Sequence, residues 1–340
     1  MRRVIAAIVV SLGASVAAQS PTPYRVTHTY DLGGDGGWDY IVPSHDEHRV
    51  YIGRTDRVMV VDENDGHLIG EVMGIKGAHG TAISLKSGHG FATSGMDQSI
   101  VMFDLKTFQE LARIPAALDA DAIVYDAPSN RVFSLNGDGN SSTVVDAATG
   151  KLVTNIPLGG KPEYGASAGD GKVYANLTDK GEIVEIDAKN ATVTRRWTTE
   201  PCRNPTSMAL DTTRKRLFSG CRSGVLAVSD YQSGKVITTL PIGMGVDGAG
   251  YDPGNRDIFA TNADGSMTVI HQDSANQYHV VGSVMTPTGS RNMGIDQLLH
   301  RIFVAAATFA PPPAGAPAGR GGRATVVPGT FKILVIEPPT

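Results

Sequence analysis

VMVVD at residues 58–62 is a short apolar segment that ends in an acidic residue, and this pattern recurs along the chain. Further copies are IVMFD at 100–104, STVVD at 142–146, IVEID at 183–187, LAVSD at 226–230, and the more divergent MTVIH at 267–271 and ILVIE at 333–337. The first five copies follow one another at intervals of 42, 42, 41 and 43 residues. An apolar stretch and a second strand such as RVYIG at 49–53 precede each copy, and a glycine-bearing turn and a further strand follow most copies. Four short strands therefore recur seven times.

A repeat of four strands in about 40 to 45 residues is typical of a β-propeller blade. A single four-stranded sheet cannot bury both of its faces, so the blades must stack around an axis. The seventh unit supplies three strands, whereas YRVTHTYDLGG at 24–34 has the pattern of an outer strand with no unit before it. Pairing this segment into the last blade would complete the ring and cover two exposed edges. The sequence therefore predicts an all-β, seven-bladed β-propeller closed by its N-terminal strand.

We expect residues 19–340 to form this propeller as a single domain with one insertion. Residues 307–330, ATFAPPPAGAPAGRGGRATVVPGT, are rich in Pro, Ala and Gly and lie between the second and third strands of the seventh unit. Because this composition cannot pack a core, we expect a surface loop there.

Residues 1–18 have the three-part pattern of a secretory signal peptide. Arg2 and Arg3 supply a basic start, an apolar run follows over residues 4–12, and small residues lead to Ala18. A membrane anchor is the alternative, but the apolar run is short for a spanning helix of roughly 20 residues. We therefore expect cleavage after Ala18 and a periplasmic or secreted protein with no transmembrane segment.

The composition excludes a disordered chain and argues against a nucleic-acid-binding protein. Of the 340 residues, 41% are hydrophobic and 19% are charged, which is enough apolar material for a large core. The formal net charge of -4 provides no electrostatic attraction for a polyanion.

The only two cysteines, Cys202 and Cys221, are predicted to form a disulfide. In a four-stranded blade, the link from the preceding blade and the turn between the second and third strands lie on the same face. Cys202 falls in such a link and Cys221 in such a turn of the fifth unit. An oxidising compartment permits this pairing, so we favour a disulfide over two free thiols.

The segments RVYIG, VMVVD and KLVTNIPLG (151–159) together resemble the repeats of the bacterial YncE-like, YVTN-repeat β-propellers. The resemblance covers roughly residues 24–338 and implies a propeller that is exported. It implies no single function, because members of this group have varied roles. The fifth and sixth units and the insertion depart from the plain repeat.

The innermost strand of each blade begins at one opening of the central channel, so its first residues are candidate site residues. Superposing the seven strand starts gives one equivalent position per blade, occupied by Asp39, Thr81, Asp121, Glu163, Thr206, Asp247 and Arg291. Their close neighbours are Trp38, Tyr40, His79, Asp119, Tyr164, Asn204 and Asn292. Converging carboxylates repel one another unless an arginine or a cation compensates them. We therefore expect either an ion pair of Arg291 with a facing acid or a hard cation, Ca²⁺ or Mg²⁺.

A purely structural interpretation remains open at this point. Asp and Thr at strand starts also cap turns by binding backbone N–H groups. The polar turns between the second and third strands carry aspartates that we interpret as turn formers, namely Asp56, Asp97, Asp138, Asp179 and Asp264. His45 and His48 fall in a polar turn where we expect solvated side chains.

Two functions compete on this sequence. The first is a binding module, expected to be a monomer, that presents a polar, acidic channel opening to a small molecule, a peptide or an exported protein. The second is a metal-dependent, lactonase-like hydrolase or lyase with Asp121, Glu163, Asn204 and Asp247 as metal ligands and His79 or a carboxylate moving a proton. No phosphate-loop or haem-attachment motif is present in the sequence. We favour the binding module over the enzyme, and place DNA binding last.

Overall fold

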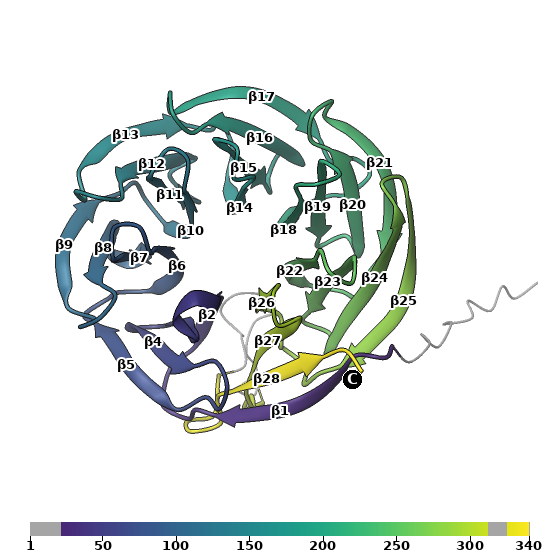
Figure 1. The fold of residues 1–340 in the computed structure, drawn as a ribbon, viewed down its shortest axis with the longest axis horizontal. Helices are drawn as coiled ribbons and strands as arrows, with labels where there is room; N and C mark the ends of the chain where they lie inside the picture. Colours follow the sequence, from purple (N-terminus) through teal and green to yellow (C-terminus); the bar gives the residue numbers. More distant parts are fainter. Residues whose placement is uncertain (1–21, 312–324, 340) are drawn as a thin grey trace, which may run out of the picture.

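The computed structural model describes residues 22–311 and 325–339 as seven four-stranded antiparallel sheets arranged around a central axis (Figure 1). The predicted seven-bladed β-propeller is therefore confirmed. Residues 1–18, the predicted signal peptide, lie outside the described residues. Among the described residues, no helix is long and apolar enough to cross a membrane.

The strands follow one another from the axis to the rim in every blade. Blades one and two comprise β2 (Trp38–Ser44), β3 (Arg49–Arg54), β4 (Arg57–Asp62) and β5 (Leu68–Met73), then β6 (Ala78–Ser84), β7 (His89–Ser94), β8 (Ser99–Asp104) and β9 (Glu110–Pro115). Blades three and four comprise β10 (Ala120–Asp126), β11 (Arg131–Asn136), β12 (Ser141–Asp146) and β13 (Leu152–Pro157), then β14 (Pro162–Ser167), β15 (Lys172–Leu177), β16 (Glu182–Asp187) and β17 (Thr192–Thr198). Blades five and six comprise β18 (Pro205–Asp211), β19 (Arg216–Cys221), β20 (Val225–Asp230) and β21 (Lys235–Pro241), then β22 (Val246–Asp252), β23 (Asp257–Asn262), β24 (Ser266–Ser274) and β25 (Gln277–Met285). Blade seven comprises β26 (Met293–Asp296), β27 (Arg301–Ala306), β28 (Lys332–Glu337) and the N-terminal β1 (Arg25–Asp31). Two short 3₁₀ helices, η1 (His45–Glu47) and η2 (Gly95–Asp97), occupy turns.

The core lies between neighbouring blades, and one buried aromatic ring per blade organises it. In each blade this ring is the third residue of the second strand. The seven rings are Tyr51, Phe91, Phe133, Tyr174, Phe218, Phe259 and Phe303. Each is at most 2% exposed. Because strand side chains alternate between the two faces of a sheet, the repeated RVYIG-type segment directs the same ring into the same inter-blade space every time. Truncating such a ring to alanine typically costs about 3–5 kcal/mol of stability.

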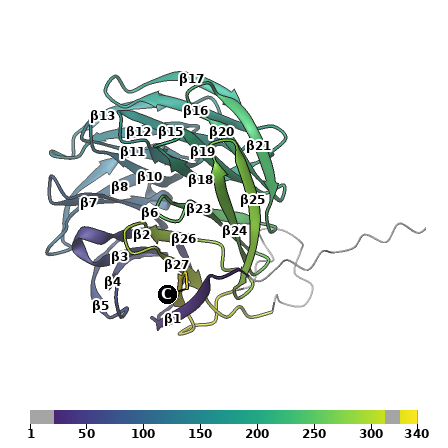
Figure 2. The same cartoon turned by 45° about the vertical axis from the view of Figure 1, so that its right-hand side comes forward.

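The N-terminal strand closes the ring as predicted. β1 pairs antiparallel with β28, with Tyr30 opposite Ile333, and Figure 2 shows it along the outer edge of the last blade. Its two ends are fixed to different blades. The Tyr24 hydroxyl donates to Asp257 Oδ2 (2.8 Å) of blade six, and the Tyr30 hydroxyl donates to the Glu63 carbonyl (3.0 Å) of blade one.

The Pro-, Ala- and Gly-rich segment 307–330 falls between β27 and β28, and its described ends pair with each other. Phe309 and Val326 form an isolated bridge, and the Val327 N–H donates to the Thr308 carbonyl (2.9 Å). The Phe309 ring lies 5.8 Å from the Trp38 ring. The base of this loop is therefore attached to the propeller, beside the start of the first inner strand.

Candidate functional site

A backbone irregularity places one side chain per blade at the opening where the inner strands begin. In six inner strands the register with the second strand shifts directly after the first residue, as between Trp38 and Ile41. Such bulges redirect a side chain away from the regular alternation. The equivalent positions that follow from the register are Asp39, His79, Asp121, Glu163, Thr206, Asp247 and Arg291.

This register corrects one member of the predicted ring. Thr81 pairs with Ala92, just as Ile41 pairs with Ile52, so Thr81 lies two residues further along its strand than Asp39. Its side chain is buried, at 4% exposure. His79 holds the ring position in blade two.

All of the ring side chains except Thr206 line a cavity of about 480 Å³, which we call the charged cavity. Its lining residues are Asp39, Tyr40, His79, Asp119, Asp121, Asp138, Lys161, Glu163, Arg222, Gly245, Asp247, Ala263, Arg291 and Asn292. Six of these residues are acidic, three are Lys or Arg, and one is His. The volume lies within the range of typical small-ligand sites.

One side of the charged cavity, the His79 half, consists of Asp39, His79 and Asp121. His79 Nδ1 lies 2.6 Å from Asp39 Oδ2 and 3.5 Å from Asp121 Oδ1. Asn292 Nδ2 donates to the other oxygen of Asp39 (3.2 Å). Asp121 Oδ1 is buried and accepts no hydrogen bond from the described residues.

The electrostatics of the His79 half follow from burial and crowding of carboxylates. Burial alone lowers the pKa of His79, but the hydrogen bond to Asp39 and the charges of Asp121, Asp39 and Asp119 outweigh it and raise this pKa to about 9. Burial and the charge of Asp39 raise the pKa of Asp121 well above its ordinary value, although His79 opposes them. At neutral pH, His79 is therefore a cation held between two aspartates.

The other side, the arginine half, consists of Glu163, Asp247, Arg222 and Arg291. One Arg222 nitrogen, Nη2, donates to Glu163 Oε1 (3.1 Å) and to Asp247 Oδ1 (3.2 Å). Arg291 Nε donates to the remaining oxygen of Asp247 (2.6 Å). Burial raises the pKa of Glu163, and the charge of Arg222 opposes this rise. The expected pairing of Arg291 with a facing acid is thus present, with Asp247 as its partner.

The position of Arg222 follows from the fifth blade. The structure joins Cys202 and Cys221 in a disulfide, as expected, with their Cα atoms 5.6 Å apart. Arg222 directly follows Cys221, and its N–H donates to the Asn204 carbonyl (3.1 Å). The disulfide therefore fixes the base of the turn from which the Arg222 side chain reaches into the cavity.

Tyr40, which lines the charged cavity, packs against Tyr164 at a tilted angle. The Tyr40 and Tyr164 rings lie 5.4 Å apart, and the Tyr40 hydroxyl donates to the Glu163 carbonyl (2.7 Å). Burial raises the pKa of Tyr164 to about 12, so its hydroxyl stays protonated at neutral pH. This pair connects blades one and four across the channel.

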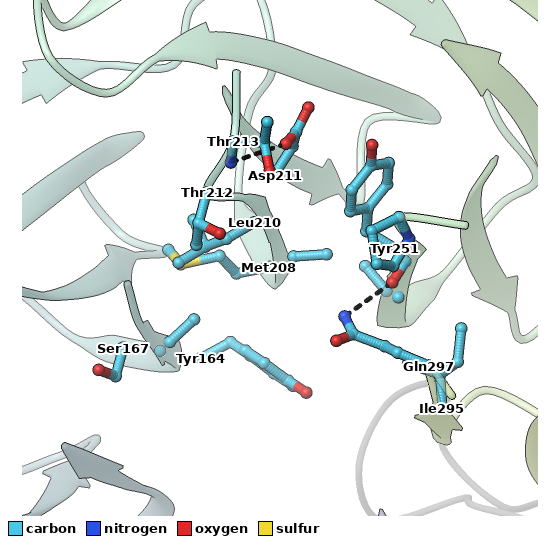
Figure 3. Close-up of a pocket in the computed structure, with 16 residues that line it drawn as sticks. Tyr164, Ser167, Met208, Leu210, Asp211, Thr212, Thr213, Tyr251, Ile295 and Gln297 are labelled. Atoms are coloured by element: carbon cyan, nitrogen blue, oxygen red, sulfur yellow. Dashed lines mark hydrogen bonds between the residues drawn. The ribbon is translucent and has the colours of Figure 1, made fainter. Parts of the chain in front are cut away.

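Beyond the tyrosines the channel is much less charged. A second cavity of about 350 Å³ at the far ends of β14, β18, β22 and β26 is lined by side chains that include Tyr164, Met208, Leu210, Tyr251 and Ile295 (Figure 3). Two of its polar side chains already have partners. Gln297 Nε2 donates to the Tyr251 carbonyl (2.9 Å), and Asp211 Oδ1 accepts the Thr213 N–H (3.0 Å). The charged cavity is therefore the stronger candidate for polar recognition.

The structure separates some of the predicted site residues from the charged cavity. The Trp38 ring packs against Phe331 (5.3 Å) and is part of the core. Asn204 directs Nδ2 to the Thr178 carbonyl (3.2 Å) and does not line the cavity. The proposed metal-ligand set Asp121, Glu163, Asn204 and Asp247 is not assembled, because Arg222 binds both Glu163 and Asp247.

Sequence reasoning missed three side chains that enter from turns. Lys161 Nζ lies 2.7 Å from Asp138 Oδ1 and 3.6 Å from Asp119 Oδ2. Asp138, interpreted from the sequence as a turn former, thus also lines the cavity. Arg222 was detectable in principle, because it replaces the turn aspartate of the ordinary units.

Comparisons with known proteins agree with this architecture. The curated protein "Probable U3 small nucleolar RNA-associated protein 18" of Schizosaccharomyces pombe is 25% identical over 119 residues. That match covers 33% of this chain and 23% of the relative, so the chain spans about a quarter of its length. The solved structure of U3-55K has a TM-score of 0.73 at 10% identity and covers 92% of this chain and 98% of its own. A chain of the mitotic checkpoint complex has a TM-score of 0.73 at 11% identity, with 90% and 96% covered. At these identities the two structures show the shared fold alone.

A protein-family model gives the broader match. The model described as outer membrane protein assembly factor BamB matches residues 82–297, which is more than half of the chain. The match extends from the inner strand of blade two to the inner strand of blade seven and includes both arginine-half carboxylates. The chain therefore belongs to the β-propeller family of the outer membrane protein assembly factor BamB.

Proposed function

We propose that the protein is an exported binding module whose charged cavity captures a positively charged segment of a partner polypeptide. The family description, an outer membrane protein assembly factor, supports a role in binding other exported proteins. A rigid propeller also suits this role, because its loops and channel opening present side chains on a fixed frame.

The single observation that carries the proposal is the state of Asp121. Its Oδ1 is buried without a hydrogen bond among the described residues, and the nearest cationic atom, His79 Nδ1, is 3.5 Å away. A buried acceptor without a donor typically costs about 1–3 kcal/mol. A ligand N–H that reaches Asp121 would recover this cost, so a guanidinium or ammonium group is the natural occupant.

The charge balance of the cavity points to the same ligand class. Six acidic residues face Lys161, Arg222, Arg291 and His79, so the acids outnumber the cations by five to four even when Asp121 is protonated. A cationic ligand group reduces this excess, whereas a carboxylate or phosphate would increase the repulsion.

One specific observation favours a second candidate, the metal-dependent hydrolase. Donor atoms of Asp39, His79 and Asp121 lie within 4.8 Å of one another, a spacing that suits a metal ion. However, an imidazole must be neutral to bind a metal, and the pKa of His79 is raised to about 9. We therefore rank the enzyme below the binding module.

We also propose the cellular context from the sequence. A signal peptide at residues 1–18 would direct the chain to the periplasm or out of the cell. The disulfide between Cys202 and Cys221 is consistent with an oxidising compartment. Within the propellers we assign the chain to the YncE-like, YVTN-repeat type, and we expect a monomer.

Calorimetric titration with short capped peptides tests the binding proposal. The probes are Ala-Arg-Ala and Ala-Gln-Ala, added to the wild-type chain, to Asp121→Asn and to the control Asp65→Asn. Asp65 is exposed in a turn outside the cavity, so its substitution removes the same charge elsewhere. We expect the arginine peptide alone to bind, and Asp121→Asn to weaken it about tenfold, or about 1.4 kcal/mol.

Two outcomes would contradict the proposal. Equal binding of the glutamine peptide would show that charge does not select the ligand. An unchanged affinity in Asp121→Asn would show that Asp121 is not the acceptor. Competition of the peptide with Ca²⁺ or Mg²⁺ at stoichiometric concentration would instead favour the metal-dependent enzyme.

A further inference from the structure

Two buried carboxyl groups meet where blade seven joins blade one, far from the charged cavity. Asp296 ends the inner strand β26, and Glu63 directly follows β4. Both side chains are completely buried. The charged cavity lies at the start of the inner strands, so this pair lies toward the opposite end.

Glu63 occupies a position that is not acidic in the other blades. Glu63 directly follows the VMVVD segment. The residues that directly follow the corresponding segments of blades two to six are Leu105, Ala147, Ala188, Tyr231 and Gln272. All of these are buried. A carboxylate at this position is therefore a departure from the repeat that needs a compensating partner.

The interface between blades five and six, or seam as we call each such interface, shows how the side chain at this position can find hydrogen-bond partners among protein groups alone. Gln272 Nε2 donates to Asp211 Oδ2 (3.0 Å), and Gln272 Oε1 accepts the Tyr251 hydroxyl (2.7 Å). Asp211 and Tyr251 correspond in register to Asp296 and Pro43. At the seam between blades seven and one, the amide donor and the hydroxyl are thus both missing.

Glu63 consequently lacks the partners that Gln272 has. Both of its carboxylate oxygens are buried and accept no hydrogen bond from an N–H group or a hydroxyl of the described residues. Burial, together with the neighbouring Asp296 carboxylate, raises the pKa of Glu63 to about 8, so a metal ion would have to displace a proton that the two acids share. Its backbone is nevertheless held in place, since its carbonyl accepts from the Tyr30 hydroxyl (3.0 Å) and from Arg301 Nη1 (3.1 Å). The carboxylate is therefore fixed beside Asp296 with free acceptor capacity.

A histidine completes the cluster. His45 Nδ1 lies 2.8 Å from Asp296 Oδ2, and donor atoms of His45, Glu63 and Asp296 all lie within 4.8 Å of one another. The second Asp296 oxygen accepts the N–H groups of Leu298 (2.8 Å) and Leu299 (3.0 Å), which fixes the carboxylate orientation. Contrary to the expectation of a solvated turn, His45 is two-thirds buried, and its exposed part provides a path for an ion.

The donor set defines the class of ion. Two carboxylates and an imidazole suit Zn²⁺ or Mn²⁺ better than Ca²⁺, which prefers six to eight oxygen ligands. His48 stands next to the cluster, with its Nδ1 3.7 Å from Glu63 Oε2 and its ring 5.8 Å from that of His45. Its ring would be a fourth donor if the side chain turned toward the cluster.

We propose that His45, Glu63 and Asp296 form a transition-metal site that fastens blade seven to blade one. The ion would join residues of the first blade to a residue more than 230 positions later in the chain. It would act beside the blade that β1 completes by pairing with β28. Metal binding would therefore stabilise the closed ring by mass action.

Calorimetry and thermal melting of chelator-treated chain test this proposal, with ZnCl₂, MnCl₂, CaCl₂ and MgCl₂ added in turn. We expect one equivalent of Zn²⁺ or Mn²⁺ to bind the wild type. At a 100-fold excess over Kd the melting temperature should rise by about 4 °C. Glu63→Gln should abolish both effects.

The chain itself supplies the matched variants. Glu63→Gln reproduces the Gln272 amide, so without metal it should melt at or above the wild-type temperature, which shows that the variant folds. Asp121→Asn alters the Asp39, His79 and Asp121 cluster only and should leave metal binding unchanged.

Three results would overturn the proposal. They are no metal-dependent shift in the wild type, a shift that persists in Glu63→Gln, or a shift lost in Asp121→Asn instead. The first result combined with a higher metal-free melting temperature of Glu63→Gln would mean that Glu63 and Asp296 merely share a proton.

Discussion

The two halves of the charged cavity compensate buried carboxylates by different means. In the arginine half, Arg222 and Arg291 direct three hydrogen bonds at Glu163 and Asp247. In the His79 half, one imidazole faces two aspartates, and Asp121 retains an oxygen without a donor. Similar positions in the repeat thus give one half in which both carboxylates bind an arginine and one half in which a carboxylate oxygen lacks a hydrogen-bond donor. A ligand gains most where donors are missing, which is why we place recognition in the His79 half.

The difference also affects how each half responds to pH. Guanidinium groups stay protonated at all physiological pH values, so the arginine half keeps its cations. His79 loses its proton within an accessible range, because its pKa is raised only to about 9. Titration of His79 therefore tests whether the two halves differ in the proposed way.

Replacing His79 by Gln should have the largest effect, and it should appear in the pH dependence of stability. The pKa of His79 rises from 6.5 to about 9 on folding, so the folded state binds the proton more tightly. The resulting stabilisation is complete below about pH 6.5 and is lost as the pH rises through about 9. It amounts to at most about 3 kcal/mol.

Urea denaturation of wild type and His79→Gln between pH 6 and 10 measures this contribution. The wild type should lose stability over the window from about 6.5 to 9 relative to the variant. The same comparison with His67→Gln, an exposed histidine in a turn outside the cavity, is the control. Parallel pH profiles of wild type and His79→Gln would show that folding does not raise the pKa of His79, and the proposed difference between the two halves would then be wrong.

Arg222→Gln should have a smaller effect on stability but should change the chemistry of the arginine half. Loss of the guanidinium leaves Glu163 and Asp247 with Arg291 alone. Because Arg222 is half exposed, water screens part of the loss, and we expect about 1–2 kcal/mol. The two freed carboxylates should then bind Ca²⁺, which is expected to raise the melting temperature of the variant and not of the wild type.

Arg203→Gln is a suitable control for this experiment, since Arg203 lies near the same disulfide and does not line the cavity. Calcium binding by the wild type would contradict the assignment of Arg222 as the built-in cation. Absence of binding in Arg222→Gln would mean that Arg291 alone compensates both acids.

The repeat was sufficient to predict the fold, because seven copies of one pattern average out local ambiguity. Pairing of β1 with β28 and of Cys202 with Cys221 followed from the expected blade topology. The site was harder. Thr81 was misplaced because the bulge at the start of the inner strand is invisible in the sequence, whereas Ser44 and Ser84 at the strand ends give the correct register.

Side chains that enter the cavity from turns explain the other differences. Lys161 and Arg222 are long and reach several ångströms from their backbone, so their position in the sequence does not show where their charges lie. Trp38 and Asn204 illustrate the reverse case. Both lie at strand starts, yet the Trp38 ring packs into the core and the Asn204 amide binds a backbone carbonyl. The residue type at a strand start does not show which of these contacts the side chain makes.

Tyr40→Phe should have the smallest effect and tests whether the two halves are coupled. The Tyr40 hydroxyl belongs to the blade that carries Asp39, and it donates to the carbonyl of Glu163 in the arginine half (2.7 Å). Removing it should cost about 1 kcal/mol in urea denaturation. Tyr164→Phe is the control, because no described residue accepts a hydrogen bond from its hydroxyl, and it should cost less.

Peptide affinity of Tyr40→Phe then shows whether the two halves are coupled. If the affinity falls although Asp121 is intact, the hydrogen bond from Tyr40 to the Glu163 carbonyl couples the arginine half to the His79 half. If affinity is unchanged, the halves act independently, and the unsatisfied oxygen of Asp121 alone accounts for recognition.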